Sequence, residues 1–369
     1  MKIIKCGMND FAQATNNRPT ICFGATELIN QMCSFYKKHK LWKNIVAIAD
    51  NDVNKHNKDF RFLWKTVQII SVDELVDICK KNNKTILVIM LLHIKCIEVL
   101  KQLNEISDLD STECYIYTML PYYDTFLQIP DNVIKMKSMN RQIPKIIHYI
   151  WMGENPIPNN HLKYMESWKK HCPDYEIKLW NERNYDIEMN KYAFEAYKAG
   201  KYSFASDYMR LAIVYEYGGI YLDTDVELLK NLDDLLYYPA YFGLGLHHSI
   251  NTGLGFGSSP KNKLIEEMMD VYNDVCFVNR DGTYNQNTCD FYQGEILRLN
   301  GFSGGNLFHI IRDSIIFPVE YFAPKNTGFG MMNISGNCYS IHHYEASHAE
   351  PNYRKRMKES QEYFKKILD

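Results

Sequence analysis

The chain has 369 residues, of which 46% are hydrophobic and 14% aromatic, and it carries a formal net charge of -2. This length and composition exclude a disordered protein and allow two domains, each with a core of its own. A nearly neutral chain has no overall basic field, so we expect no nucleic acid partner.

The cysteines and the N-terminus indicate where the protein works. The ten cysteines include no C-x-x-C pair and are scattered through apolar segments, which favours reduced, mostly buried thiols inside a cell. The first twenty residues contain no apolar stretch of signal-peptide length, and the strongest apolar run, 86–92, is too short to cross a bilayer. We therefore expect a soluble, cytoplasmic protein.

Residues 1–140 alternate between short apolar runs and amphipathic helical periods. The expected strands are TICFGA, NIVAIAD, VQII, ILVIMLL and YIYTM, and the expected helices cover 27–38, 73–81 and 94–103. Such alternation is typical of a parallel α/β sheet. We predict a small Rossmann-like domain over residues 1–140.

Nucleotide binding by this first domain is a separate question. Its first turn, FGAT, has one glycine where a dinucleotide fingerprint has three, although Asp50 ends the second strand where a ribose-binding acid could lie. The sequence favours a docking or scaffold role and leaves nucleotide binding as the alternative.

A second α/β domain is predicted over residues 141–350, after the aperiodic, basic segment KMKSMNRQIP. Its strands are expected at KIIHYIW and YEIKLW, and its helices over 161–171, 191–199 and 203–217. Later segments are richer in Gly, Asn and Tyr, which predicts a loop-rich C-terminal half.

The helix expected over 203–217 contains a charged pair. Apolar residues cover most of its faces, which predicts a buried helix. Asp207 and Arg210 share one face of it, where an unpaired charge is costly. The two side chains could form a structural ion pair and nothing more. However, Gly218-Gly219 ends the helix and leads directly into a second charged element.

That second element, IYLDTDV, alternates like a strand and would point Tyr221, Asp223 and Asp225 in one direction. Two adjacent carboxylates raise each other's pKa unless a cation lies nearby, and Mg²⁺ or Mn²⁺ would relieve their repulsion. D-x-D spacing alone is a weak signal, because 50–52 and 108–110 repeat it in polar turns. The apolar surroundings of the third copy single it out.

Three segments carry a resemblance to a known family: IPKIIHYIWMG (143–153), ASDYMRLAIVYEYGGIYLDTDV (205–226) and IHHYEAS (341–347). They resemble the DXD-containing sugar transferases of glycosyltransferase family 32, which is related in pattern to the large glucosylating clostridial toxins. The resemblance covers about residues 143–348 and implies a GT-A fold, a metal-dependent nucleotide-sugar donor and retention of anomeric configuration. The N-terminal domain lies outside it.

The resemblance also implies roles for single residues. Trp151 would form a wall of the nucleobase pocket, and Asp207 with Arg210 would hold the donor sugar and its diphosphate. Asp223 and Asp225 would be the metal-binding acids, with Asp225 a direct ligand. Tyr221, Asn251 and Ser347 would contact the donor. Tyr344 and His348 stand where the family usually has tryptophans, so the C-terminal motif departs from the pattern.

Two further features near the C-terminus suggest roles. His342 and His343 would point to opposite faces of a strand, so at most one binds the metal, and the motif favours His343. Residues 351–369 are predicted to form a basic amphipathic helix, either packed as an ordinary terminal helix or resting on an anionic membrane surface.

Together these features predict a cytoplasmic, retaining glycosyltransferase, in part associated with the inner membrane surface, that uses Mn²⁺ or Mg²⁺. Its partners would be a nucleotide-sugar donor, with UDP-sugar favoured by the resemblance, and a saccharide or lipid-linked saccharide acceptor in surface polysaccharide biosynthesis. One alternative is a toxin-like transferase that modifies a protein, although the chain has no evident secretion segment. Another is a sugar-nucleotide-binding protein without turnover.

Overall fold

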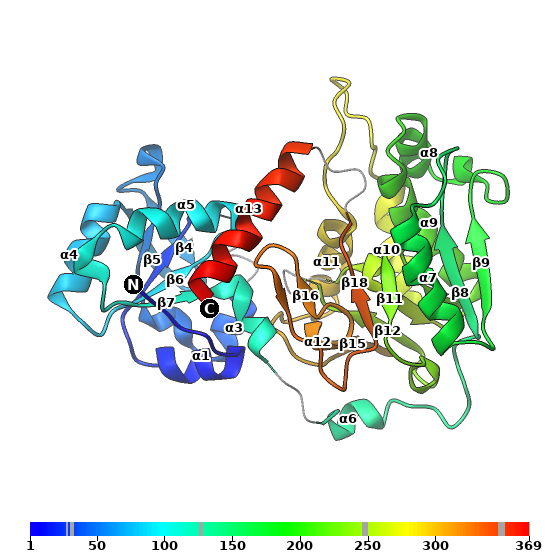
Figure 1. The fold of residues 1–369 in the computed structure, drawn as a ribbon, viewed down its shortest axis with the longest axis horizontal. Coiled ribbons are helices and arrows are strands. Elements are labelled where there is room, and N and C mark those ends of the chain that lie inside the picture. Colours follow the sequence, from blue (N-terminus) through cyan, green and yellow to red (C-terminus); the bar gives the residue numbers. More distant parts are fainter. Residues whose placement is uncertain (27–28, 30–32, 125–127, 246–249, 346–350, 369) are drawn as a thin grey trace.

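The protein is described from a computed structural model that covers residues 1–369 except 27–28, 30–32, 125–127, 246–249, 346–350 and 369. The fold is mixed α/β and contains two seven-stranded sheets within this described part. Figure 1 shows the first sheet in blue and cyan on the left and the second in green to orange on the right, with helix α13 (red) between them.

The first sheet is formed by residues 2–116 and has the strand order β1-β7-β6-β2-β3-β5-β4. Its pairs are parallel except for the β4–β5 hairpin. The strands are β1 (Lys2–Ile3), β2 (Thr20–Phe23), β3 (Ile45–Ala49), β4 (Asp59–Phe62), β5 (Lys65–Ile70), β6 (Ile86–Ile89) and β7 (Glu113–Ile116). Strands β2 and β6 are buried on both faces, as the continuous apolar runs predicted.

Helices cover both faces of this sheet. They are α1 (Met8–Thr15), α3 (Cys33–Lys38), α4 (Val72–Lys81) and α5 (His93–Asn104). Strand β1, helix α1 and strand β4 were not predicted, because two- to eight-residue elements give too few periods to recognise. The expected helix over 27–38 is described only from Cys33 onward; its earlier residues lie largely outside the described part.

The second sheet is mixed and has the order β14-β15-β12-β13-β10-β8-β9. Its strands are β8 (Ile146–Ile150), β9 (Glu176–Trp180), β10 (Gly219–Tyr221), β12 (Ala240–Gly243), β13 (Phe256–Ser258), β14 (His309–Ile311) and β15 (Ser314–Phe317). Strands β9, β8 and β10 are parallel, and β13 runs antiparallel beside β10. The short helix α6 (Asp131–Ile134) lies on the connection between the two sheets (Figure 1).

The helices that accompany the second sheet are α7 (Asn159–His171), α8 (Lys191–Lys198), α9 (Tyr202–Tyr217), α10 (Lys263–Asp270), α11 (Cys289–Leu299) and α12 (Val319–Phe322). Helix α9 is buried over most of its length, including Asp207 and Arg210. Two small pairings complete the fold: β11 (Val226–Leu228) with β18 (Ser340–His342), and β16 (Lys325–Asn326) with β17 (Met331–Met332).

A buried histidine fixes the bend between α9 and β10. Gly218 and Gly219 both adopt positive φ, and the ring Nε2 of His148 on β8 lies 2.8 Å from the Gly218 carbonyl oxygen. The Trp180 indole donates to His148 Nδ1 at 3.0 Å, so the ring is a neutral imidazole that donates through Nε2. Burial lowers the pKa of His148 to about 4.

We expect His148 to make folding stability depend on pH. Its pKa is lower in the folded chain than the unfolded value of about 6.5, so the unfolded state takes up the proton first and stability falls as pH drops from 6.5 towards 4. Between pH 7 and pH 5 this one group should cost about 2 kcal/mol. Urea unfolding of wild type and His148→Gln at both pH values measures it. Equal losses in the two proteins would contradict the assignment.

The C-terminal helix α13 (Pro351–Leu368) packs against the N-terminal unit. Phe364 is fully buried, and its ring lies edge-on to that of Phe329 at 4.5 Å. Ser360 donates to the Gly328 carbonyl oxygen at 2.6 Å. The apolar face that the sequence offered to a membrane is therefore buried against other parts of the protein. The basic side chains of Lys355, Lys358, Lys365 and Lys366 remain exposed.

Two other sequence predictions meet simple structural findings. The nine cysteines whose side chains are described are all unpaired, and seven of them are buried. Within the described residues, no helix is long and apolar enough to span a membrane.

Candidate active site

The D-x-D segment lies in a turn between two strands. Strand β10 ends at Tyr221 and β11 begins at Val226, and the Val226 N–H donates to the Asp223 carbonyl oxygen at 3.0 Å. The prediction of one continuous strand over IYLDTDV was therefore wrong. A turn can bring two carboxylates separated by one residue together, as a flat strand also would, but it additionally lets the chain leave the sheet and pair with β18.

Asp223, Asp225 and His342 form a cluster that can hold a metal ion. One ligand atom from each lies within 4.8 Å of the others. His342 Nε2 is 3.3 Å from Asp225 Oδ1 and 3.7 Å from Asp223 Oδ2. His342 is buried, and neither ring nitrogen has a hydrogen-bond partner. A buried imidazole without a partner beside two carboxylates suits a divalent cation, which accepts nitrogen and oxygen ligands.

His342 occupies the position that the sequence analysis gave to His343. His343 points to the other side of the chain, where its Nε2 lies 2.9 Å from Glu227 Oε2 and its ring stacks on Tyr164 at 3.8 Å. Burial lowers the pKa of His343, whereas the two carboxylates outweigh burial and raise the pKa of His342. The two histidines do face opposite ways, as predicted, but their roles are exchanged.

The Asp207–Arg210 pair of α9 reaches this cluster. Arg210 Nη2 lies 3.0 Å from Asp207 Oδ1 and 3.7 Å from Asp223 Oδ1. Arg210 also donates from Nε to the Ser206 carbonyl oxygen at 3.0 Å, and the Tyr221 hydroxyl donates to Asp223 Oδ1 at 2.7 Å. The pair is therefore more than a local ion pair, because it extends to the D-x-D turn.

Burial and charge set the ionisation of these groups. Burial raises the pKa of Asp207 to about 7, since the attraction of Arg210 only partly compensates for the loss of water. Burial also opposes charge on Asp223, but Arg210 and His342 outweigh it and lower its pKa to about 2. Burial opposes the Arg210 charge too, yet Asp223 and Tyr221 hold its pKa well above the usual range. A fixed cation and a fixed anion thus lie side by side.

Asn251 lies next to the D-x-D turn. Its side chain caps a short 3₁₀ turn by accepting from the Gly253 N–H at 2.8 Å. A Cβ atom on Gly253 would lie 2.4 Å from Asp223 Oδ2, 3.0 Å from Asn251 Oδ1 and 3.1 Å from Arg210 Nη1. These three side chains therefore converge on one glycine, where any larger residue would displace them.

Trp151 follows β8 and is linked to the turn indirectly. Its ring lies 6.0 Å from that of His161, and His161 Nδ1 is 2.8 Å from Thr224 Oγ1, the residue between the two acids. Trp151 is only partly buried. Ser347, the remaining predicted donor contact, lies outside the described residues.

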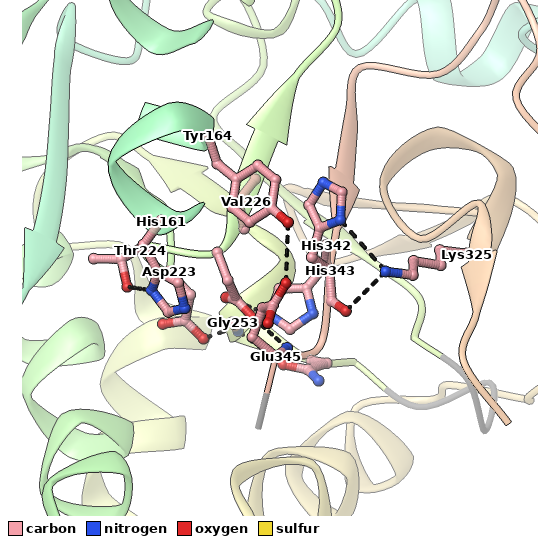
Figure 2. A network of polar contacts seen from close by, with 12 residues as sticks. His161, Tyr164, Asp223, Thr224, Val226, Gly253, Lys325, His342, His343 and Glu345 are labelled. Carbon is pink, nitrogen blue, oxygen red and sulfur yellow. Dashed lines mark hydrogen bonds and ion pairs between the residues drawn. The ribbon is translucent and has the colours of Figure 1, made fainter. Parts of the chain in front are cut away.

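One face of α7 holds the turn in place, and the sequence gave no sign of this. His161, Tyr164 and Trp168 follow the i, i+3, i+7 spacing of a helix face. The Trp168 indole donates to the Val226 carbonyl oxygen at 2.7 Å, and Ser167 Oγ accepts from the Leu228 N–H at 2.8 Å. Figure 2 shows His161 and Tyr164 beside the turn. A polar face on α7 was the only available signal, and a solvated face explains it equally well.

Comparison with known proteins identifies the same region. Residues 158–241 match the family model described as "Glycosyltransferase sugar-binding region containing DXD motif". This stretch is similar to the sugar-binding region of DXD glycosyltransferases. It includes α9, the D-x-D turn and β11, whereas Trp151, Asn251 and His342 lie outside it.

Curated relatives carry the same description. Inositol phosphoceramide mannosyltransferase 3 of Schizosaccharomyces pombe is 36% identical over 126 residues, which is 32% of this chain and 35% of the relative. The uncharacterized glycosyltransferase L373 of Acanthamoeba polyphaga mimivirus is 25% identical over 214 residues, 54% of this chain and 81% of the relative. The chain thus spans about a third of the mannosyltransferase.

A solved structure titled "PaToxG Glycosyltransferase" is 19% identical and covers 42% of this chain and 68% of that one. Its TM-score of 0.35 is too low to establish a shared fold.

Proposed function

We propose that the protein is a metal-dependent glycosyltransferase that takes a sugar from a nucleotide-sugar donor. The observation that carries this proposal is the meeting of Asp223, Asp225 and His342 with the buried Asp207–Arg210 pair. The similarity of residues 158–241 to DXD glycosyltransferases supports it. We further propose the GT-A arrangement for residues 141–350, with residues 1–140 as a Rossmann-like domain of docking or scaffold role and 351–369 as a terminal helix.

The residues suit the charge that develops when a nucleoside diphosphate leaves a sugar. A divalent ion, Mn²⁺ or Mg²⁺, would be held by Asp225 and His342, with Asp223 beside it, and would supply positive charge for the diphosphate. Arg210 is held in place by Ser206 and Asp207 and adds a second fixed cation. Preorganised positive charge at a leaving group accounts for much of the rate enhancement in such sites.

The other side chains would orient the donor. Asp207, Tyr221 and Asn251 line the same region and offer acceptors and donors to sugar or ribose hydroxyls, while Trp151 would stack against the base. A hydrolase reading is less favoured, because two acids in one short turn cannot easily lie on both sides of a glycosidic bond. Retention of anomeric configuration and a UDP-sugar donor follow from the family resemblance.

The acceptor is proposed as a saccharide or lipid-linked saccharide of surface polysaccharide biosynthesis, handled at the cytoplasmic side of a membrane. The printed names of several relatives describe mannosyl transfer to inositol phosphoceramide, a lipid, which is compatible with a lipid-linked acceptor. Because α13 buries its apolar face, any membrane contact would depend on its exposed lysines.

A thermal-shift screen of nucleotide sugars with and without Mn²⁺ tests the function. Ligand bound to the folded state at a hundredfold excess over Kd stabilises it by about 2.7 kcal/mol, so the correct donor should raise the melting temperature only when Mn²⁺ is present. Release of free nucleoside diphosphate on adding an acceptor separates an enzyme from a sugar-nucleotide-binding protein. No shift with any donor, or equal shifts without metal, would contradict the proposal.

A further inference from the structure

Asp225 is held by two backbone N–H groups of the segment that follows β18. The Glu345 N–H donates to Asp225 Oδ2 at 2.9 Å, and the His343 N–H donates to the Asp225 carbonyl oxygen at 3.0 Å. The other carboxylate oxygen, Oδ1, is the one that lies 3.3 Å from His342 Nε2. These contacts commit one oxygen of Asp225 to the protein and direct the other towards the metal cluster.

Both residues that hold Asp225 are themselves held by Tyr164. The Tyr164 hydroxyl donates to Glu345 Oε1 at 3.0 Å. Its ring stacks face to face on the imidazole of His343, with centroids 3.8 Å apart and an interplanar angle of 8°. Figure 2 shows Tyr164 reaching towards this segment from α7, while Lys325 contacts His343 from another side. Tyr164, Glu345, Asp225 and His343 thus form a closed ring of contacts.

We propose that Tyr164 is a positioning residue that sets the geometry of Asp225 for metal binding. This inference rests on the proposed function but concerns a residue outside the D-x-D motif and outside the C-terminal motif. Tyr164 touches neither Asp225 nor the cluster through any contact described above, so it acts through Glu345 and His343. Residues that orient metal ligands commonly change metal affinity or activity by 10–100-fold when altered.

The structure also separates two roles for Glu345. Its backbone N–H holds Asp225, and its side chain accepts from Tyr164. If Glu345 only positions, Glu345→Gln should work almost as well as wild type, because the amide oxygen still accepts from the tyrosine hydroxyl. If its carboxylate were a metal ligand, the same change would remove a charged ligand.

The test is a Mn²⁺ titration of the purified full-length chain, with free Mn²⁺ followed by electron paramagnetic resonance. Tyr164→Phe keeps the stack but loses the hydroxyl and should weaken Mn²⁺ binding about tenfold, whereas Tyr164→Leu loses both and should approach a hundredfold. Glu345→Gln should stay within about threefold of wild type. In turnover assays, Tyr164→Phe should raise the KM for the donor and leave the acceptor KM unchanged.

The matched control is Tyr215→Phe. Its hydroxyl donates to Glu266 Oε1 at 2.7 Å, the same chemistry on an outer part of α9, so its loss should leave Mn²⁺ affinity unchanged. Equal Mn²⁺ affinity of Tyr164→Phe and wild type would overturn the positioning role, as would a loss in Glu345→Gln as large as in Asp225→Asn. Mn²⁺ binding without any donor binding would overturn only the proposed function. No Mn²⁺ binding in wild type would remove both.

Discussion

Asp225→Asn is expected to abolish metal-dependent donor binding and to lower turnover by about 10³-fold or more, equivalent to several kcal/mol of lost charge stabilisation. Asp225 is buried, and its Oδ1 faces His342 across 3.3 Å. Asparagine keeps an oxygen that can accept from the Glu345 N–H, so the local fold should persist while the negative charge is lost. Donor-dependent thermal shifts and turnover under limiting Mn²⁺ measure the effect.

Asp110→Asn is the matched control for that change. Asp110 ends the D-x-D copy at 108–110, and its side chain is 72% exposed, far from any cluster of ligands described here. Its replacement should alter neither metal dependence nor turnover. Near-wild-type turnover of Asp225→Asn at limiting metal would show that the site is assigned to the wrong residues.

His342→Ala should weaken Mn²⁺ affinity about a hundredfold, because it removes the imidazole that faces both carboxylates and leaves their repulsion less compensated. His343→Ala should change the affinity by at most about tenfold, since its backbone N–H continues to hold Asp225 and only the stack on Tyr164 is lost. A metal titration of both variants at pH 7.5 compares them. A larger loss in His343→Ala would restore the prediction made from the sequence and contradict the observed geometry.

The helix of the candidate site could be predicted from the sequence because its signal is strong and local. An apolar helix with two charges three residues apart, ended by two glycines, has few interpretations, and α9 and its bend follow this prediction closely. Most strands of the first sheet were also predictable, since parallel strands buried on both faces are continuous apolar runs.

The turn at Asp223–Asp225 and the choice of histidine could not be predicted in the same way. Alternation over IYLDTDV fits a strand, but Thr224 is drawn to His161 and Val226 pairs with His342, so tertiary contacts override the local pattern. Which of His342 and His343 faces the acids depends on the register of β18 against β11, which no local feature determines. Tyr164 lies 59 or more residues from every acid it supports, and a single tyrosine on a polar helix face has no periodic signal.

The arrangement of ligands around a divalent ion is the central claim, and anomalous scattering tests it most directly. Crystals grown with Mn²⁺ and a nucleoside diphosphate should show a manganese peak about 2.0–2.2 Å from both Asp225 Oδ1 and His342 Nε2, with Asp223 beside it and diphosphate oxygens completing the shell. A peak at His343 and Glu227, or no peak at Asp225 under conditions that support donor binding, would contradict the account.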